Sequence, residues 1–200
     1  EEAGSPTART GWQPLPIATH GPDGRPDAVM PAYVKSHSLG EYVFDHGWAD
    51  AWERAGGDYY PKLQIAVPFT PVPGRRLLAH KPVLAPALIA AAERVVAAHG
   101  LSSAHATFIA AAEVPLFEQA GWLIRADSQF HWLNDGYRSF DDFLASLSSR
   151  KRKMIRKERA LALEGLEVVQ LSGAGIEQAH WDAFWAFYQD TGARKWGRPY

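Results

Sequence analysis

Residues 12–35 read WQPLPIATHGPDGRPDAVMPAYVK, and this stretch predicts two β-strands that are joined by a tight turn. The strands are expected at Trp12–Thr19 and Ala28–Lys35. Between them, Gly21-Pro22-Asp23-Gly24 combines the residue types that favour a reversal of the chain. The fold is therefore expected to start from a pair of strands.

Helices and strands alternate through the rest of the chain. Helices are expected at Tyr42–Ala55, Ala85–His99, Glu113–Ala120 and Ile176–Gln189, and strands at Tyr59–Val67, Arg75–His80, Ala104–Ala110, Trp122–Leu133 and Leu166–Leu171. This order predicts the α/β class, with a mixed sheet flanked by helices. Turn residues at 134–136 predict a boundary between one domain at 1–134 and a second at 135–200. Because the chain starts without Met and stops soon after its last helix, we expect both domains to be truncated.

The composition is that of a folded and nearly neutral protein. The chain is 46% hydrophobic with a formal net charge of −1, which suits a core and argues against general coating of nucleic acid. It has no Cys, which excludes disulfides and Cys-ligated zinc and fits a reducing, cytoplasmic compartment. No apolar run approaches 18 residues, so no membrane span is expected. Without a zinc or EF-hand motif, no metal site is expected either.

Positive charge is concentrated in one predicted helix. Residues 150–159 hold seven Lys or Arg, and Ser139 with Asp142 forms an S-x-x-D capping box ahead of them. One apolar stripe is expected to run from Phe140 to Ala162, with the cations opposite it. A solvated surface is one interpretation, and contact with a phosphate-bearing ligand is the other. Few acids interleave with the cations, which weakens the first interpretation. The candidate phosphate-binding residues are Arg150, Arg152, Lys153 and Arg156.

A second cluster of charged and aromatic residues lies at the strand-to-helix junction of residues 33–48. The ends of strands are where α/β folds place their sites. The catalytic candidates, as general bases, are His37, Glu41 and Asp45, and the substrate-binding candidates are Lys35 and Trp48. The alternative is that these residues cap the helix and fill the core, and the sequence gives the two interpretations about equal weight.

Three further residues complete the expected cleft of the first domain as substrate-binding candidates. Tyr60 is one of them. Lys62 alternates with apolar residues on its predicted strand, so its side chain can project into a cleft. The alternative is an edge-strand lysine next to Pro61 that limits aggregation. Arg75 either binds an anion or flanks a loop.

Three phrases of the sequence together resemble one family. They are KSHSLGEYVFD at residues 35–45, YYPKLQIAVPFTPV at 59–72 and FDDFLASLSSRKRK at 140–153. They resemble the bacterial GNAT-superfamily proteins of peptidoglycan biosynthesis/recognition, which are related to FemAB-like aminoacyltransferases. Residues 116–122, LFEQAGW, also resemble the end of a GNAT domain. In such proteins a basic R-x-N-I-R helix opens the second domain, and here Met154 stands where Asn is usual.

The resemblance implies two GNAT-like domains in tandem and an N-acyltransferase activity. It implies acyl-CoA or aminoacyl-tRNA as the donor and an amine, such as that of a peptidoglycan precursor, as the acceptor. The GNAT pyrophosphate loop, Q/R-x-x-G-x-G/A, is missing, because residues 79–86 read AHKPVLAP and their prolines remove amide donors. The alternative function is therefore a non-catalytic RNA- or precursor-binding module on a GNAT-like scaffold.

Overall fold

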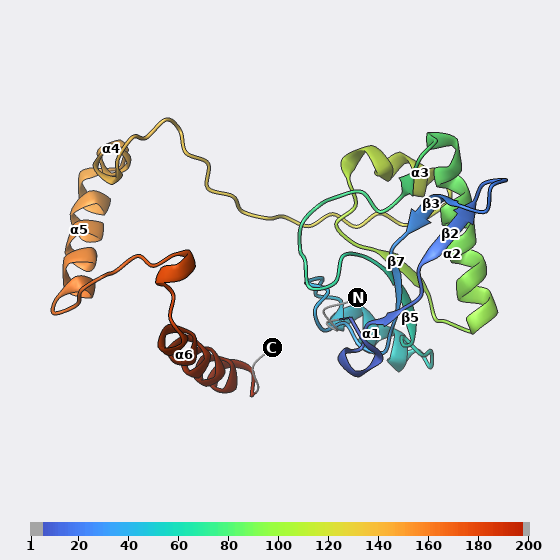
Figure 1. Ribbon diagram of the computed structural model, residues 1–200, viewed down its shortest axis with the longest axis horizontal. Coiled ribbons are helices and arrows are strands. Elements are labelled where there is room, and N and C mark those ends of the chain that lie inside the picture. Colours follow the sequence, from blue (N-terminus) through green and yellow to red (C-terminus); the bar gives the residue numbers. More distant parts are fainter. Residues whose placement is uncertain (1–5, 198–200) are drawn as a thin grey trace. The chain divides into compact units, whose positions relative to one another are not determined.

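The computed structural model describes residues 6–197, which divide into two compact units. Unit 1 is Glu1–Ser128 and unit 2 is Gln129–Tyr200. Figure 1 shows the sheets and helices of unit 1 and the helices of unit 2. The predicted domains at 1–134 and 135–200 stay a prediction. The terminal residues on which the expected truncation rests, 1–5 and 198–200, lie outside the described part of the chain.

Prolines divide each of the two predicted N-terminal strands into a pair. After a short 3-10 helix, η1 (Ala8–Thr10), the strands are β1 (Gln13–Pro14), β2 (Ile17–His20), β3 (Pro26–Met30) and β4 (Ala32–Lys35). Pro16 and Pro31 stand at the two breaks, where a missing amide donor interrupts a strand ladder. The predicted turn is confirmed, since Gly24 N donates to Gly21 O over 2.9 Å.

The strands of unit 1 form two sheets. One has the order β1-β4-β5-β7, where β5 is Lys62–Ile65 and β7 is Ala104–Ala106. The β5–β7 pair is parallel, and the other pairs are antiparallel, with Lys35 opposite Lys62. The second sheet has the order β2-β3-β6, where β6 is Leu78–Ala79. The predicted α/β class with a mixed sheet is confirmed, and its GNAT-like character stays a prediction.

The core of unit 1 forms where helix α2 (Ala85–His99) packs on strands of both sheets. Leu88 and Ile89 of the helix are buried with Leu63 and Ile65 of β5 and with Phe117. Burial of each such side chain contributes about 1.5–3 kcal/mol. The bounds of α2 agree with the prediction, and Gly100 ends the helix with a positive φ of 62°. The short turn η2 (Pro82–Leu84) leads into it.

Two smaller helices complete unit 1. Helix α1 is His46–Arg54, so it begins later than the predicted Tyr42 because residues 42–45 form a loop, in which Tyr42 has a φ of 56°. Helix α3 is Val114–Gln119 and follows the turn η3 (Ala111–Glu113).

Two predicted strands, Trp122–Leu133 and Leu166–Leu171, have no strand structure in the described chain. A strand needs a neighbour to satisfy its amide and carbonyl groups. Among the described residues these segments pair with none, and apart from Trp122 their apolar side chains are exposed, as Leu123 is at 97% and Phe130 at 99%. The prediction of these two strands is therefore wrong.

Unit 2 consists of three helices and a short turn. They are α4 (Phe140–Ser146), α5 (Ser149–Leu163), η4 (Gly173–Gly175) and α6 (Gln178–Trp196). The single apolar stripe predicted through Ala162 is wrong, because the helix breaks at Leu147 and Ser148, which are extended. The Ser148 side chain starts α5 by accepting from Lys151 N. Ser139 caps α4 as predicted, with Asp142 N donating to its hydroxyl over 3.1 Å.

Candidate functional site: a buried ion cluster

The ammonium group of Lys62 lies at the centre of a buried ion cluster. Its Nζ donates to Glu41 Oε2 over 2.9 Å, to Asp45 Oδ2 over 2.8 Å and to Ser38 Oγ over 2.9 Å. The Lys62 side chain is 0% exposed, and those of Glu41 and Asp45 are 1% and 4% exposed. Because an ammonium has three donors, all three N–H groups are used. The cluster therefore fixes the loop of residues 38–45 to strand β5.

Two tyrosines enclose the cluster from the segment before β5. The Tyr59 hydroxyl donates to Asp45 Oδ2 over 2.9 Å, and the Tyr60 hydroxyl lies 2.7 Å from Ser38 Oγ. Their rings meet edge to face at 5.1 Å. The carboxylate of Asp45 thus receives hydrogen bonds from Lys62, Ser38 and Tyr59, which favours its charged form.

A second buried lysine lies opposite Lys62 on the neighbouring strand. Lys35 Nζ donates to Leu39 O over 3.0 Å and lies 3.8 Å from the centroid of the Trp12 ring. A cation over an aromatic face is attracted by the negative face of the ring. Both lysines of the Lys35–Lys62 pair in the β4–β5 ladder therefore hold the same loop.

Burial and the interactions with Lys62 act in opposite directions on the pKa values of the two carboxyl groups in the cluster. Burial raises the pKa of Glu41, against the charge and hydrogen bond of Lys62. Burial also works to raise the pKa of Asp45, but its hydrogen bonds from Lys62, Ser38 and Tyr59 and the charge of Lys62 hold that pKa below its usual value. Burial lowers the pKa of Lys35 to about 8, with Glu41 opposing the shift. The pKa of Glu41 is raised and that of Asp45 is lowered. In enzyme active sites, two carboxyl groups whose pKa values are shifted apart in this way take different acid and base roles.

One oxygen of each carboxylate has no partner. Among the described residues, Glu41 Oε1 and Asp45 Oδ1 are buried without a hydrogen bond. A buried acceptor without a donor costs free energy, so such atoms point to function or strain. Chemically, the pair offers a proton acceptor, Glu41, next to a carboxylate that stays charged, Asp45.

Of the residues predicted from the sequence for this cleft, five meet in the cluster and three do not. The five are Lys35, Glu41, Asp45, Tyr60 and Lys62. His37 lies against Gly11, where a Cβ would collide with its ring, and its Nδ1 accepts from Leu39 N. Trp48 is 67% exposed on α1. Arg75 is exposed and donates to Leu77 O. The catalytic and substrate-binding roles themselves stay predictions.

Four residues of the cluster were missed. Ser38 and Tyr59 lie within the phrases at residues 35–45 and 59–72, but neither was among the sequence candidates. Trp12 and His105 come from distant segments, and only the three-dimensional pairing of β5 with β7 brings His105 near. Its ring meets that of Tyr59 edge to face at 5.7 Å, and Ser103 Oγ lies 2.8 Å from its Nε2.

A second buried contact holds the loop that follows β5. The Glu113 carboxylate accepts from Arg76 N over 2.8 Å and from Leu77 N over 2.9 Å. The Arg76 guanidinium in turn donates to Thr107 O and Val72 O, each over 3.1 Å. Neither residue was among the sequence candidates. Their side chains therefore hold residues 72–77, directly ahead of β6, in place.

The four predicted phosphate-binding residues of α5 divide into two pairs. Arg152 donates to Leu147 O over 3.0 Å, and Arg156 contacts Asp141 Oδ1 over 3.1 Å. Both therefore join α5 to α4. The side chains of Arg150 and Lys153 are exposed and form no hydrogen bond or ion pair with any residue of the described range 6–197. Their phosphate-binding role stays a prediction.

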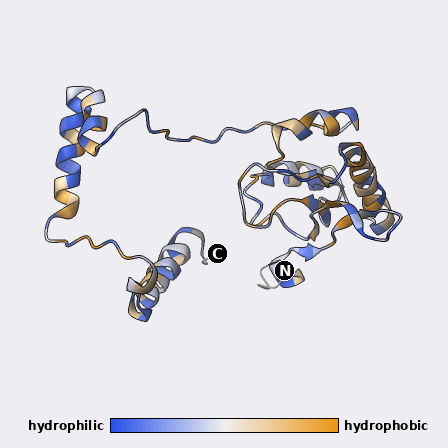
Figure 2. Cartoon of the chain, turned by 45° about the horizontal axis from the view of Figure 1, so that its top comes forward, coloured by the Kyte–Doolittle hydropathy of each residue, from blue (hydrophilic) through white to orange (hydrophobic). Residues whose placement is uncertain are grey.

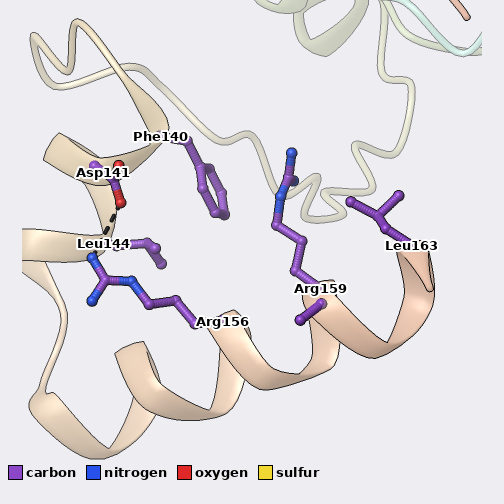
Figure 3. Close-up of a pocket in the computed structure, with 7 residues that line it drawn as sticks. Phe140, Asp141, Leu144, Arg156, Arg159 and Leu163 are labelled. Carbon is purple, nitrogen blue, oxygen red and sulfur yellow. Dashed lines mark hydrogen bonds and ion pairs between the residues drawn. The ribbon is translucent and has the colours of Figure 1, made fainter. Parts of the chain in front are cut away.

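A hollow of about 340 Å³ lies between α4 and α5 (Figure 3). Arg156 and Arg159 extend over it from α5, and Phe140 and Leu144 come from α4. The Arg159 guanidinium lies 4.6 Å from the centroid of the Phe140 ring. Arg156 and Arg159 therefore both have partners on α4.

The histidine beside the cluster predicts a pH dependence of stability. Burial lowers the pKa of His105 from 6.5 to about 4, and the charge of Lys62 acts in the same direction. Between these values the unfolded chain binds more protons, so the free energy of unfolding is expected to fall as the pH drops from 6.5 to 4. In His105→Gln, urea unfolding across this window should show a smaller fall. Parallel curves for the two proteins would contradict the assignment.

Two further features of the described residues concern metal ions and membranes. Within residues 6–197 no group of three or more His, Cys, Asp or Glu is placed to hold a metal ion. By length and composition alone, one helical segment in that range, Pro82–His99, is apolar enough to cross a membrane. It contains α2, whose Leu88, Ile89 and Ala92 are buried in the core.

Comparison with known proteins gives one match. The family model described as FemAB-like, peptidoglycan biosynthesis/recognition, matches residues 1–200. No curated protein and no solved structure is significantly similar to the chain.

Proposed function

Because the chain belongs to the FemAB-like family of peptidoglycan biosynthesis/recognition proteins, we propose that it is an N-acyltransferase that delivers an aminoacyl group to an amine of a peptidoglycan precursor. The family match over residues 1–200 is the observation that carries this proposal. We assign the reaction to the bacterial cytoplasm, in keeping with a chain that has no Cys.

The proposed reaction forms an amide bond and breaks an ester bond. The lone pair of the acceptor amine attacks the ester carbonyl of the donor, and the bond from the carbonyl carbon to the ribose oxygen breaks. The proton that the amine loses passes through the base to that oxygen, which leaves as the RNA hydroxyl. Glu41 is the proposed proton acceptor, because its pKa is raised and its Oε1 is without a partner in the described chain. Lys62 and Asp45 position it and are not in contact with the reacting atoms.

The donor is proposed to be aminoacyl-tRNA and not acyl-CoA. Acyl-CoA pyrophosphate is commonly held by free amide donors at a helix N-terminus. Here α2 is preceded by η2, and Pro82 is the first residue of η2 while Pro86 is the second residue of α2. Proline has no amide donor. Arg150 and Lys153 of α5 are proposed to contact phosphate groups.

One observation favours the alternative, a precursor- or RNA-binding module without catalysis. The side chains of Lys62, Glu41 and Asp45 are at most 4% exposed, so substrate contact requires the loop of residues 38–45 to open. In a binding module, the same cluster would serve only to hold that loop.

A transfer assay tests the proposal. The purified protein is incubated with a precursor peptide that carries a free lysine amine, and with either aminoacyl-tRNA or acetyl-CoA as donor. We expect amide formation with aminoacyl-tRNA and none with acetyl-CoA, followed by mass spectrometry of the peptide. Transfer from acetyl-CoA would overturn the donor assignment. Saturable binding of the peptide without transfer from either donor would establish the binding module.

A further inference from the structure

The cations of helix α5 lie on two different faces. At about 100° per residue, Arg152, Arg156 and Arg159 fall within an arc of about 60°. All three contact α4, through Leu147 O, Asp141 and the Phe140 ring. This row is structural, and Figure 3 shows two of its members extending over α4 residues.

A second row of cations faces away from α4. Arg150, Lys153 and Lys157 fall within another arc of about 60°, centred about 120° from the first. All three are exposed, and within residues 6–197 their side chains form no hydrogen bond, ion pair or ring contact. Like charges spaced three and four residues apart destabilise a helix slightly. The row therefore gains stability when an anionic surface neutralises it.

Apolar side chains share this second face. Met154 and Leu161 lie within about 40° of Arg150, and they are 50% and 59% exposed. Figure 2 shows α5 as hydrophilic over most of its length and hydrophobic toward its C-terminal end. The segment that follows continues the apolar character, with Leu166 at 66% and Val168 at 70% exposure.

From this arrangement we infer that the face of α5 made by Arg150, Lys153, Met154, Lys157 and Leu161 binds the surface of an anionic lipid bilayer. This inference rests on the phosphate-binding role that is proposed above for α5, and it identifies the phosphates as those of lipid head groups. The cations contact the head groups, while Met154 and Leu161 enter the boundary with the acyl chains. The helix lies on the membrane and does not cross it.

The mixture of residue types favours lipid over RNA. An RNA backbone is recognised by cations, hydroxyls and amides, and bases by aromatic rings. Exposed Met and Leu between the cations gain nothing from a phosphate backbone, whereas each contributes burial energy at a lipid interface. The face itself carries no aromatic residue.

Vesicle co-sedimentation tests the inference. The protein is mixed with vesicles of phosphatidylcholine alone or of phosphatidylcholine and phosphatidylglycerol in equal parts. We expect binding to the second kind only, with affinity that falls as salt is added. Arg150→Gln/Lys153→Gln/Lys157→Gln should lower the partition coefficient about a hundredfold. Met154→Ser/Leu161→Ser should lower it about tenfold or more.

A matched control removes three exposed cations elsewhere, in Arg9→Gln/Arg54→Gln/Arg94→Gln. This variant has the same net charge as the first and should bind the vesicles nearly as the original protein does. Helix content by circular dichroism confirms that each variant is folded. Equal vesicle binding by both triple variants would overturn the inference. A second result would also overturn it: the protein binds single-stranded RNA but not vesicles, the cation variant weakens this RNA binding, and Met154→Ser/Leu161→Ser leaves it unchanged. The transfer assay uses a soluble peptide, so its failure and loss of vesicle binding are separate outcomes.

Discussion

Lys62→Met is expected to lower the free energy of unfolding of unit 1 by about 3–5 kcal/mol. The change removes the only ammonium that contacts Glu41, Asp45 and Ser38 among the described residues. Two carboxylates would then be buried without the ammonium that contacts both of them, which costs far more than the lost hydrogen bonds alone. Urea unfolding followed by tryptophan fluorescence measures the effect.

Lys81→Met is the matched control, because Lys81 is exposed at the start of η2. It should change the free energy of unfolding by no more than about 0.5 kcal/mol. If Lys62→Met does not fold, Lys62→Met/Glu41→Leu/Asp45→Leu should recover folded protein, since an apolar replacement of the whole ion group removes the unpaired charges. A midpoint for Lys62→Met equal to that of the original protein would contradict the account of the cluster.

Glu41→Gln is expected to lower kcat/KM for aminoacyl transfer about 10²- to 10⁴-fold. The amide keeps the shape of the side chain and an oxygen that accepts from Lys62, but it is a very weak base. The free energy of unfolding should therefore fall by only about 1–2 kcal/mol. Initial rates with saturating aminoacyl-tRNA and varied peptide amine measure the loss.

The control for this prediction is Glu53→Gln, an exposed residue of α1. Its transfer rate should match that of the original protein. A Glu41→Gln protein that is stable and fully active would remove Glu41 from the proposed chemistry and leave it with a structural role alone.

Much of the cluster could be predicted from the sequence because it comes from two short phrases. Lys35, Glu41 and Asp45 fall within residues 35–45, and Lys62 follows two tyrosines. Local spacing brings such residues near one another. Local spacing does not predict burial. The sequence predicts that Lys62 lies in a cleft or on an edge strand, whereas its strand, β5, is an interior strand between β4 and β7.

The errors concern places where distant partners decide the structure. Residues 122–133 were predicted to form a strand, but pairing is a property of two segments, and no described segment pairs with this one. The apolar stripe from α4 into α5 was read as one helix, yet Ser148 starts a new one by capping it. Likewise, no local pattern announces that Glu113 contacts Arg76, which lies 37 residues earlier.

The Glu113 contact also affects which backbone donors are free beside strand β6. β6 is an edge strand of its sheet, and edge strands with unpaired amides recruit strands from other molecules. Just before β6, the amides of Arg76 and Leu77 are already bound by the Glu113 carboxylate. An incoming strand would find these two donors occupied by a side chain of the same chain. A single glutamate thus blocks intermolecular strand addition at this point.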